Sequence, residues 1–313
     1  MRHRGGLPVA ARSAWATRAS YAPDVYPISV SVAMKGQRMA SADISRLSFD
    51  RLAAIFDDQR ALPDDALAAL RDAFVAMVDS GFRTLIESGA GTGRIAIPAL
   101  AAGFRVAASD ISSPMLDVLR ARLATIPELR DRCEIVTCDA AALPFANGAF
   151  DVAVLAQVLY LIPDWERALD QAIRVVRAGG RVVLVQERTT MSPALAAWDA
   201  AWRDAVARAG HRPIPQVPTD DEAAEALGTR CVDLRVDALP SWEFGQTAGE
   251  AFAGLHRLRP LYPDLHDAAW EAAIVAFRRW HAASDLDDAV RLAGTVTLTL
   301  VSGSVPGRSQ QPP

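Results

Sequence analysis

Apolar residues follow two alternating spacings from about residue 46 onward. In residues 64–80 they recur every three or four positions, which predicts an amphipathic helix. Pro63 precedes this segment and Gly81 follows it, as expected at helix ends. The same spacing predicts helices over residues 93–102, 114–126 and 165–177. Short apolar runs between these helices predict strands over residues 83–88, 104–110, 134–139, 151–157 and 181–187.

The predicted strands contain mostly Val, Ala and Leu with little polar alternation, which is typical of strands covered on both faces. A regular order of strand and helix predicts a parallel sheet with helices on both sides. The fold class expected from this pattern is therefore α/β, with a doubly wound and mostly parallel sheet.

The pattern changes after Glu187. Residues 192–209 and 267–281 have helical spacing, and residues 210–260 are irregular and contain several prolines. Residues 231–239 and 294–302 alternate in polarity or are rich in β-forming residues, and predict two more strands. We therefore expect seven strands in all, with helical cap elements after the fifth strand.

Charge and composition divide the chain of 313 residues further. Residues 1–40 carry a net charge of +5, and the whole chain carries −4, so the remainder is acidic. We expect residues 1–45 to be a disordered or spurious extension and residues 46–302 to be one domain. Within that domain, residues 46–188 would form a cofactor half and residues 189–302 the cap and last two strands. The Pro- and Gly-rich residues 303–313 predict a disordered tail.

Several classes of protein are disfavoured by composition. An acidic body argues against nucleic acid as a partner. No apolar run reaches the roughly 18 residues of a membrane span. Three cysteines, none in a CxxC pair, predict neither a metal site nor a disulfide framework, which favours a cytoplasmic location. A monomer and a homodimer are both compatible with the sequence.

A glycine-rich loop follows the first predicted strand, in the segment Glu87-Ser-Gly89-Ala90-Gly91-Thr-Gly93. Glycines at such a turn let backbone N–H groups approach a ligand, and the next helix presents its N-terminus there. Dinucleotide sites use the spacing G-x-G-x-x-G, whereas here the third glycine comes one residue early and Arg94 stands at the last position. Glu87 would also repel a pyrophosphate, but it suits a cofactor that carries an ammonium group and a sulfonium.

The segment E-x-G-x-G-x-G resembles motif I of class I S-adenosylmethionine-dependent methyltransferases. Residues 104–116, 138–165 and 174–187 are similar to the following motifs of that family, and residues 49–60 are similar to the first helix of its ubiquinone/menaquinone-biosynthesis subset. The resemblance covers about half of the chain. It implies a methyltransferase fold, S-adenosyl-L-methionine as the cofactor, and a small-molecule acceptor.

The resemblance also implies roles for individual residues. Asp110 would hold the ribose hydroxyls, with Ile111 against the adenine and Met115 in the same motif. Asp139 would meet the adenine amino group beside Ala140. Ala156 and Gln157 would line the methionine part, and Arg60 could pair with its carboxylate. The implied cofactor-binding set is Arg60, Glu87, Gly89, Ala90, Gly91, Gly93, Asp110, Ile111, Met115, Asp139, Ala140, Ala156 and Gln157.

Some of these residues allow a second interpretation. Asp110 would serve an NAD ribose equally well, Asp139 could cap a helix, and Arg60 could form a surface ion pair. Five tryptophans after residue 189 could line an apolar acceptor pocket or pack a core, and helical spacing at positions 198/202 and 270/280 favours packing. They are Trp198, Trp202, Trp242, Trp270 and Trp280.

Methyl transfer needs an aligned and dry approach of nucleophile and methyl group more than it needs acid–base chemistry. A carbon or oxygen nucleophile can still need a base, and the candidates are Tyr160, Glu187, His211 and His256. Tyr160 follows the fourth strand and is the preferred catalytic candidate. A [D/N]-P-P-[Y/F] motif and a Pro-Cys dipeptide are both absent, which argues against nucleobase acceptors.

The sequence therefore predicts a methyltransferase that acts on a small, apolar or aromatic acceptor. One alternative is an NAD(P)-dependent oxidoreductase, which the glycine spacing disfavours. Another is a non-catalytic cofactor-binding protein of the same fold, which no residue excludes.

Overall fold

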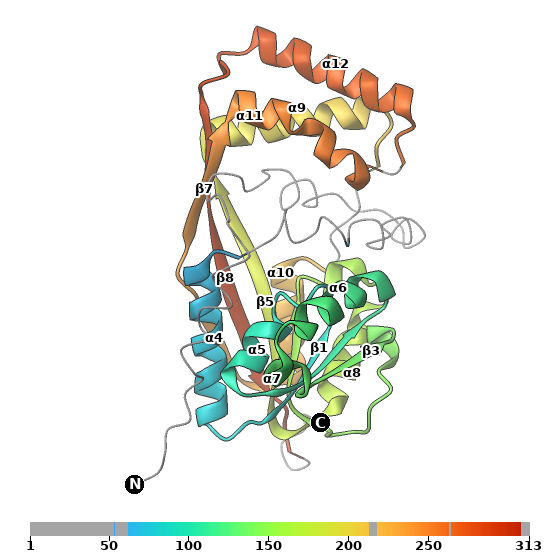
Figure 1. Ribbon diagram of the computed structural model, residues 1–313, viewed down its shortest axis with the longest axis vertical. Coiled ribbons are helices and arrows are strands. Elements are labelled where there is room, and N and C mark those ends of the chain that lie inside the picture. The colour runs from blue at the N-terminus through green and yellow to red at the C-terminus, as the bar shows by residue number, and fades with distance from the viewer. Residues whose placement is uncertain (1–52, 54–61, 213–217, 263, 308–313) are drawn as a thin grey trace.

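The computed structural model describes residues 53, 62–212, 218–262 and 264–307. Its centre is an eight-stranded sheet in the order β3-β2-β1-β4-β5-β8-β6 (Figure 1). Strand β7 lies outside this order and pairs with the first part of β8, whereas β6 pairs with its last part. The strands are β1 (Thr84–Ser88), β2 (Arg105–Asp110), β3 (Cys133–Thr137), β4 (Phe150–Ala156), β5 (Val176–Met191), β6 (Val232–Ala238), β7 (Trp242–Thr247) and β8 (Arg291–Ser304).

The first five strands are parallel, and β8 is antiparallel to β5, β6 and β7. The expected doubly wound, mostly parallel α/β fold is confirmed. The sheet has one strand more than the seven expected, because β7 forms within the segment expected to be irregular.

Helices cover both faces of the sheet. On one face, α4 (Asp64–Asp79), α5 (Ala96–Ala102), α6 (Ser113–Ala124) and α7 (Pro127–Arg130) share a core with side chains such as Leu85 and Val154. On the other face, α8 (Trp165–Val175) and α10 (Asp220–Arg230) pack on neighbours such as Ile86 and Leu155. Consecutive strand residues therefore enter opposite cores, which explains why the strands are apolar without alternation.

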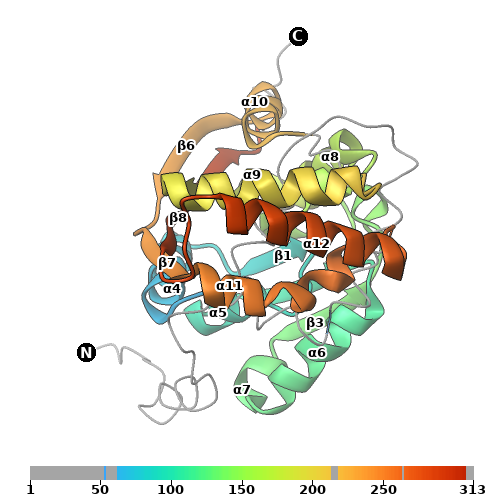
Figure 2. The same cartoon turned by 90° about the horizontal axis from the view of Figure 1, so that it is seen from above.

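A second layer of helices forms the cap. It consists of α9 (Pro193–Arg208), α11 (Ala248–Ala253), the 3₁₀ segment η5 (Leu255–Leu261) and α12 (Asp267–Ala283). The long strands β5 and β8 run from the sheet up to it, with the shorter β7 beside the upper part of β8 (Figure 1). The cap lies on the side to which the parallel strands point their carboxyl ends (Figure 1). From above, α9, α12 and α11 lie side by side over the sheet (Figure 2). The expected helical cap after the fifth strand is therefore present.

The cap has an aromatic core. Trp198 and Trp202 of α9 lie edge-on to Phe277 of α12, with ring centroids 4.8 and 5.2 Å apart. The indole Nε1 of Trp202 donates to the buried hydroxyl of Tyr262 at 2.8 Å. Trp198, Trp202, Trp242 and Trp270 are all buried. These four tryptophans therefore serve packing, as helical spacing favoured for Trp198, Trp202 and Trp270.

Two elements of the expected irregular segment have capping boxes that the sequence contains. Thr219 and Glu222 cap α10 reciprocally, and Thr247 and Glu250 cap α11 in the same way.

Near the C-terminal end of the described residues, β8 continues two residues into the segment expected to be a disordered tail. Val305 then exchanges backbone hydrogen bonds with Gly179 and Gly180 at 2.9 Å.

Candidate functional site

The parallel strands end together, and this brings the candidate residues to one edge of the sheet. Ser88, the last residue of β1, lies opposite Ser109 of β2 and Leu155 of β4. Asp110, the last residue of β2, lies opposite Thr137 of β3. The glycine loop, Asp110, Asp139 and Gln157 follow these strand ends directly. Ligands of open α/β sheets bind at this carboxyl edge.

Each glycine of the loop has a positive φ, of +80° at Gly89, +52° at Gly91 and +88° at Gly93. A side chain would also collide with neighbours. A Cβ at Gly89 would lie 2.4 Å from Val158 Cγ2, and one at Gly93 would lie 2.4 Å from Leu119 Cδ1. Both the backbone conformation and the close packing therefore require glycine here.

Asp110 anchors the loop to the end of β2. Its Oδ2 accepts a hydrogen bond from Gly91 N, and its Oδ1 accepts one from Ser112 N, both at 2.8 Å. The N–H groups of Gly89 and Ala90 donate to the Ser109 carbonyl at 2.8 and 2.9 Å. The Asp110 carboxylate thus holds the glycine loop and the start of α6 together at the end of β2.

Glu87 is a buried carboxyl group at the base of the loop, 1% exposed. Its Oε2 contacts no hydrogen-bond partner among the described residues. Burial, and to a smaller extent the charge of Asp110, raises the pKa of Glu87 well above its ordinary value, although the Ala96 N–H and Arg94 act in the opposite direction. A cation beside Oε2 would satisfy this oxygen and favour the charged form.

Arg94 opens the turn that leads into α5 and reaches across the sheet to β5. Its Nη2 donates to Glu187 Oε2 at 2.8 Å, with 15% of the Arg94 side chain and none of the Glu187 side chain exposed. This pair ties the glycine loop to β5. It also engages the Glu187 carboxylate, which the sequence analysis considered as a possible base. The pairing itself was not predicted, because 93 positions separate the two residues.

Two apolar residues follow Asp110. The Ile111 side chain is 75% exposed at the sheet edge, although it is large and apolar. Met115 is buried beneath the loop, where its Cε would lie 3.2 Å from a Cβ at Gly91. Ile111 is thus placed to cover a flat apolar group, and Met115 supports the loop from below.

Asp139 begins the 3₁₀ turn η3 (Ala140–Ala142), and its Oδ1 accepts from Ala141 N at 2.8 Å. The capping role considered from the sequence is therefore present. Asp139 is exposed, and the cap uses only its Oδ1, so Oδ2 is placed to meet a donor. Cys138 has a raised pKa, chiefly because it is partly buried, which disfavours a reactive thiolate.

Gln157 has a φ of +52°, an uncommon conformation for a residue other than glycine. Its backbone N and its Nε2 donate to the Val185 carbonyl at 3.2 and 3.3 Å. This turn, directly after Ala156, brings Val158 against Gly89. Tyr160 follows in η4 (Leu159–Leu161) and lines a small pocket of about 20 Å³ with Gln157.

The other predicted residues have different surroundings. Arg60 lies outside the described residues. His211 is half-buried, and its Nδ1 lies 2.8 Å from Asp264 Oδ1. His256 is exposed, with its Nδ1 3.0 Å from the Ala253 carbonyl. No described contact connects either histidine to the loop residues.

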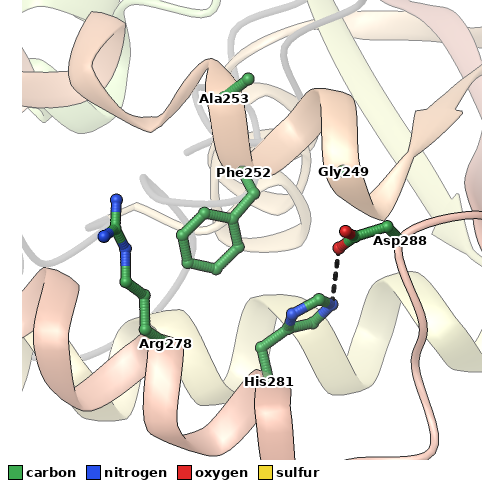
Figure 3. A pocket seen from close by; sticks show the side chains of 6 residues that line it. All are labelled: Gly249, Phe252, Ala253, Arg278, His281 and Asp288. Carbon is green, nitrogen blue, oxygen red and sulfur yellow. Dashed lines mark ion pairs between the residues drawn. The ribbon is translucent and has the colours of Figure 1, made fainter.

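The cap contains a pocket of about 330 Å³ between α11 and α12 (Figure 3). Phe252 lies between Arg278 on one side and His281 with Asp288 on the other. None of the predicted cofactor residues lines this pocket. In the described part of the chain, no three His, Cys, Asp or Glu residues form a group that could hold a metal, and no helix could cross a membrane.

A family model described as "Methyltransferase domain" matches residues 86–184, which run from β1 into β5 and contain the glycine loop, Asp110, Asp139 and Gln157. Residues 86–184 therefore match a methyltransferase domain. The predicted resemblance to methyltransferases is confirmed over this segment, and the match gives no support to the oxidoreductase alternative.

Curated relatives agree with this domain assignment. The chain is 31% identical over 164 residues to a demethylmenaquinone methyltransferase of Clavibacter sepedonicus, covering 50% of this chain and 65% of that protein. It is 37% identical over 105 residues to a ubiquinone/menaquinone biosynthesis C-methyltransferase of Methylobacterium nodulans, covering 33% and 41%. The chain thus spans less than two thirds of the length of these relatives.

A solved structure supports the fold of the methyltransferase domain. A Bacillus halodurans protein proposed to be a methyltransferase superposes with a TM-score of 0.50 at 14% identity, covering 77% of this chain and all of that one. At this identity the likeness concerns the fold alone.

Proposed function

We propose that the protein is an S-adenosylmethionine-dependent methyltransferase that acts on a small, apolar or aromatic acceptor. The observation that carries the proposal is Glu87, whose buried Oε2 has no partner among the described residues and lies at the base of the glycine loop. A buried carboxylate is costly without a partner. The ammonium group of S-adenosylmethionine would supply a cationic one, whereas the pyrophosphate of a dinucleotide would be repelled.

The other residues at this edge fit the same cofactor. Asp110 holds Gly91 at the end of β2, where its carboxylate would accept hydrogen bonds from the ribose hydroxyls. Ile111 offers an exposed apolar side chain to the adenine, and Asp139 keeps one oxygen for the adenine amino group. Ala156 and Gln157 would line the methionine part. Arg60 stays a proposed partner of the methionine carboxylate.

When bound, S-adenosylmethionine supplies a methyl group already activated by the sulfonium charge. The protein then has to place the acceptor in line with that methyl group and exclude water. The glycine loop is held rigidly for this task by Asp110, by Ser109 and by Val158 packed against Gly89. Tyr160 is the group that we propose to hold or remove a proton at the acceptor.

The acceptor class is inferred from the side chains near Tyr160. The small pocket is lined by apolar residues that include Leu155 of β4 and Leu184 of β5, and by Pro218 and Ala223 just before and within α10. The chain that returns from the cap therefore forms one wall next to Tyr160. The relatives named for demethylmenaquinone and ubiquinone/menaquinone methylation also favour an apolar, aromatic acceptor. The proposal takes residues 46–302 as one catalytic unit, because β8 returns to the same sheet.

The full chain can be tested with S-adenosylmethionine and a panel of reduced naphthoquinols, benzoquinols, phenols and small amines, following S-adenosylhomocysteine release. We expect turnover with an aromatic member of the panel and a matching gain of one methyl group by mass spectrometry. Asp110→Ala should abolish it, and Asp117→Ala, on the exposed face of α6, should not. Turnover with nucleic acid alone would refute the acceptor class. Binding of the cofactor without transfer to any acceptor would favour a binding protein.

A further inference from the structure

Strand β6 forms an open edge of the sheet. Among the described strands it pairs with β8 on one side and with none on the other. Its apolar side chains are exposed, with Val232 at 37%, Leu234 at 49% and Val236 at 69%. Natural edge strands are usually protected from pairing, so an exposed apolar edge points to an interaction surface.

Only the second half of β6 is regular. Asp233 has a φ of +51°, and the register with β8 shifts between Val232 and Arg235. From Arg235 to Ala238 each residue pairs in turn with β8. The free edge available for another strand is therefore this short segment, which has Val236 at its centre.

The charges of this segment are complementary to themselves. Arg235 and Asp237 share one face because side chains alternate along a strand, and Val236 points to the other face. Neither charged residue forms a salt bridge within the part of the chain that the structure describes.

The apolar side chains of β6 differ in their surroundings. Leu234 packs against α10, since its Cδ1 would lie 3.0 Å from a Cβ at Gly228. Val236 is thus the most exposed apolar side chain of the strand.

A second copy of β6 can be paired antiparallel about a two-fold axis at Val236. Arg235 then lies opposite Asp237 of the second copy, and Asp237 lies opposite Arg235, so two opposite-charge pairs form. An axis at Arg235 or at Asp237 would instead place like charges opposite each other, which destabilises a ladder. An axis at Leu234 would need regular pairing through Asp233, where the strand is distorted.

We propose that the protein forms a homodimer by antiparallel pairing of the two β6 edges about Val236, which joins both sheets into one. Isologous two-fold contacts of this kind are the commonest form of oligomer. The paired segment is short, so the interface is small and the dissociation constant should be on the order of micromolar. The surface lies at the sheet edge and contains none of the proposed cofactor residues, so the dimer does not depend on the proposed function.

The oligomeric state of the full chain tests this directly by sedimentation velocity between about 1 and 200 μM. We expect a monomer–dimer equilibrium for the natural sequence. Val236→Lys should give a monomer throughout, because it places two like charges on the axis. Val275→Lys is the matched control, since Val275 is 45% exposed on α12 and should leave the equilibrium unchanged. A natural chain that stays monomeric, or a dimer that Val236→Lys does not disturb, would overturn the proposal.

Charge exchange tests the pairing itself. Arg235→Asp and Asp237→Arg should each weaken the dimer by on the order of tenfold or more, because each turns two attractive pairs into repulsive ones. The double variant restores both pairs and should recover dimerisation. Circular dichroism of the single variants would detect a loss of folding, which would otherwise also weaken the dimer. If the single and double variants are all folded and the double variant does not recover dimerisation, this register is refuted.

Cysteine crosslinking tests the position of the axis. Val236→Cys places two thiols opposite each other, and mild oxidation should yield a covalent dimer on a non-reducing gel. Leu234→Cys lies opposite Ala238 of the second copy and should not crosslink. Crosslinking by Leu234→Cys but not by Val236→Cys would overturn the axis at Val236.

Discussion

The Arg94–Glu187 pair offers a quantitative test of how the glycine loop is held. The two groups are 2.8 Å apart, and the Glu187 side chain is fully buried. Removing Arg94 would leave a buried carboxylate without its cation, which typically costs about 3–5 kcal/mol. For a chain of this size, a loss of about 3 kcal/mol should lower the melting temperature by roughly 6–12 °C. We therefore expect Arg94→Met and Glu187→Leu each to be strongly destabilising.

The double variant should behave differently. An apolar pair of similar volume leaves no buried charge, so Arg94→Met with Glu187→Leu should recover most of the stability lost in each single variant. The exposed pair Arg188–Asp221 is a matched control, because its atoms are 2.9 Å apart but its side chains are 63% and 88% exposed. Disrupting this exposed pair should lower the free energy of unfolding by less than about 1 kcal/mol.

Denaturant unfolding of the natural chain, the two single variants and the double variant in a double-mutant cycle gives the coupling energy between Arg94 and Glu187. A value near that of the exposed control pair would refute the idea that the buried pair fastens the loop to β5. Arg94→Met has a second expected effect, because Arg94 lowers the pKa of Glu87. Its loss should raise that pKa further and weaken binding of a cationic cofactor at neutral pH.

Three further outcomes are expected at the same site. First, the raised pKa of Glu87 favours the neutral acid in the folded state, so the stabilising contribution of Glu87 fades as the pH rises through that pKa. In melting experiments without ligand, Glu87→Gln should therefore gain stability relative to the natural chain as the pH increases. Its affinity for S-adenosylhomocysteine should fall. A stability difference that does not change with pH would contradict a raised pKa at Glu87. Second, Gly89→Ala should cost roughly 2–4 kcal/mol, since its Cβ would lie 2.4 Å from Val158 Cγ2 at a positive φ. Gly81→Ala has a positive φ and no atom within 4 Å, so urea unfolding should show only about 1–2 kcal/mol, and equal losses would count against the packing argument. Third, Tyr160→Phe should lower kcat and leave the S-adenosylhomocysteine dissociation constant unchanged; an unchanged kcat would remove Tyr160 from the chemistry.

The sheet and its edge could be predicted because local patterns determine them. Unbroken apolar runs indicated buried strands, and the glycine loop, Asp110 and Asp139 follow strand ends that a parallel sheet brings together. The extra strand β7 was missed because its sequence is short and contains Gly245, which weakens a strand pattern. Helices α10 and α11 could have been found from their capping boxes.

Long-range pairings could not be predicted in the same way. Nothing local to Arg94 or Glu187 indicates that they meet, because their contact depends on how β5 packs beside the loop. The left-handed turn at Gln157 and the approach of Val158 to Gly89 likewise follow from tertiary packing. The bond between His211 and Asp264 spans 53 positions, so nothing local to His211 indicates that its side chain is only 12% exposed.

The central claim is that the glycine loop binds S-adenosylmethionine rather than a dinucleotide. Thermal unfolding of the purified full chain, with S-adenosylhomocysteine or NAD added, tests it most directly. A ligand at about 100 times its dissociation constant adds roughly 2.7 kcal/mol to the stability of the native state. We predict that S-adenosylhomocysteine raises the melting temperature, that NAD does not, and that Asp110→Ala removes most of the rise. A rise with NAD and none with S-adenosylhomocysteine would contradict the account.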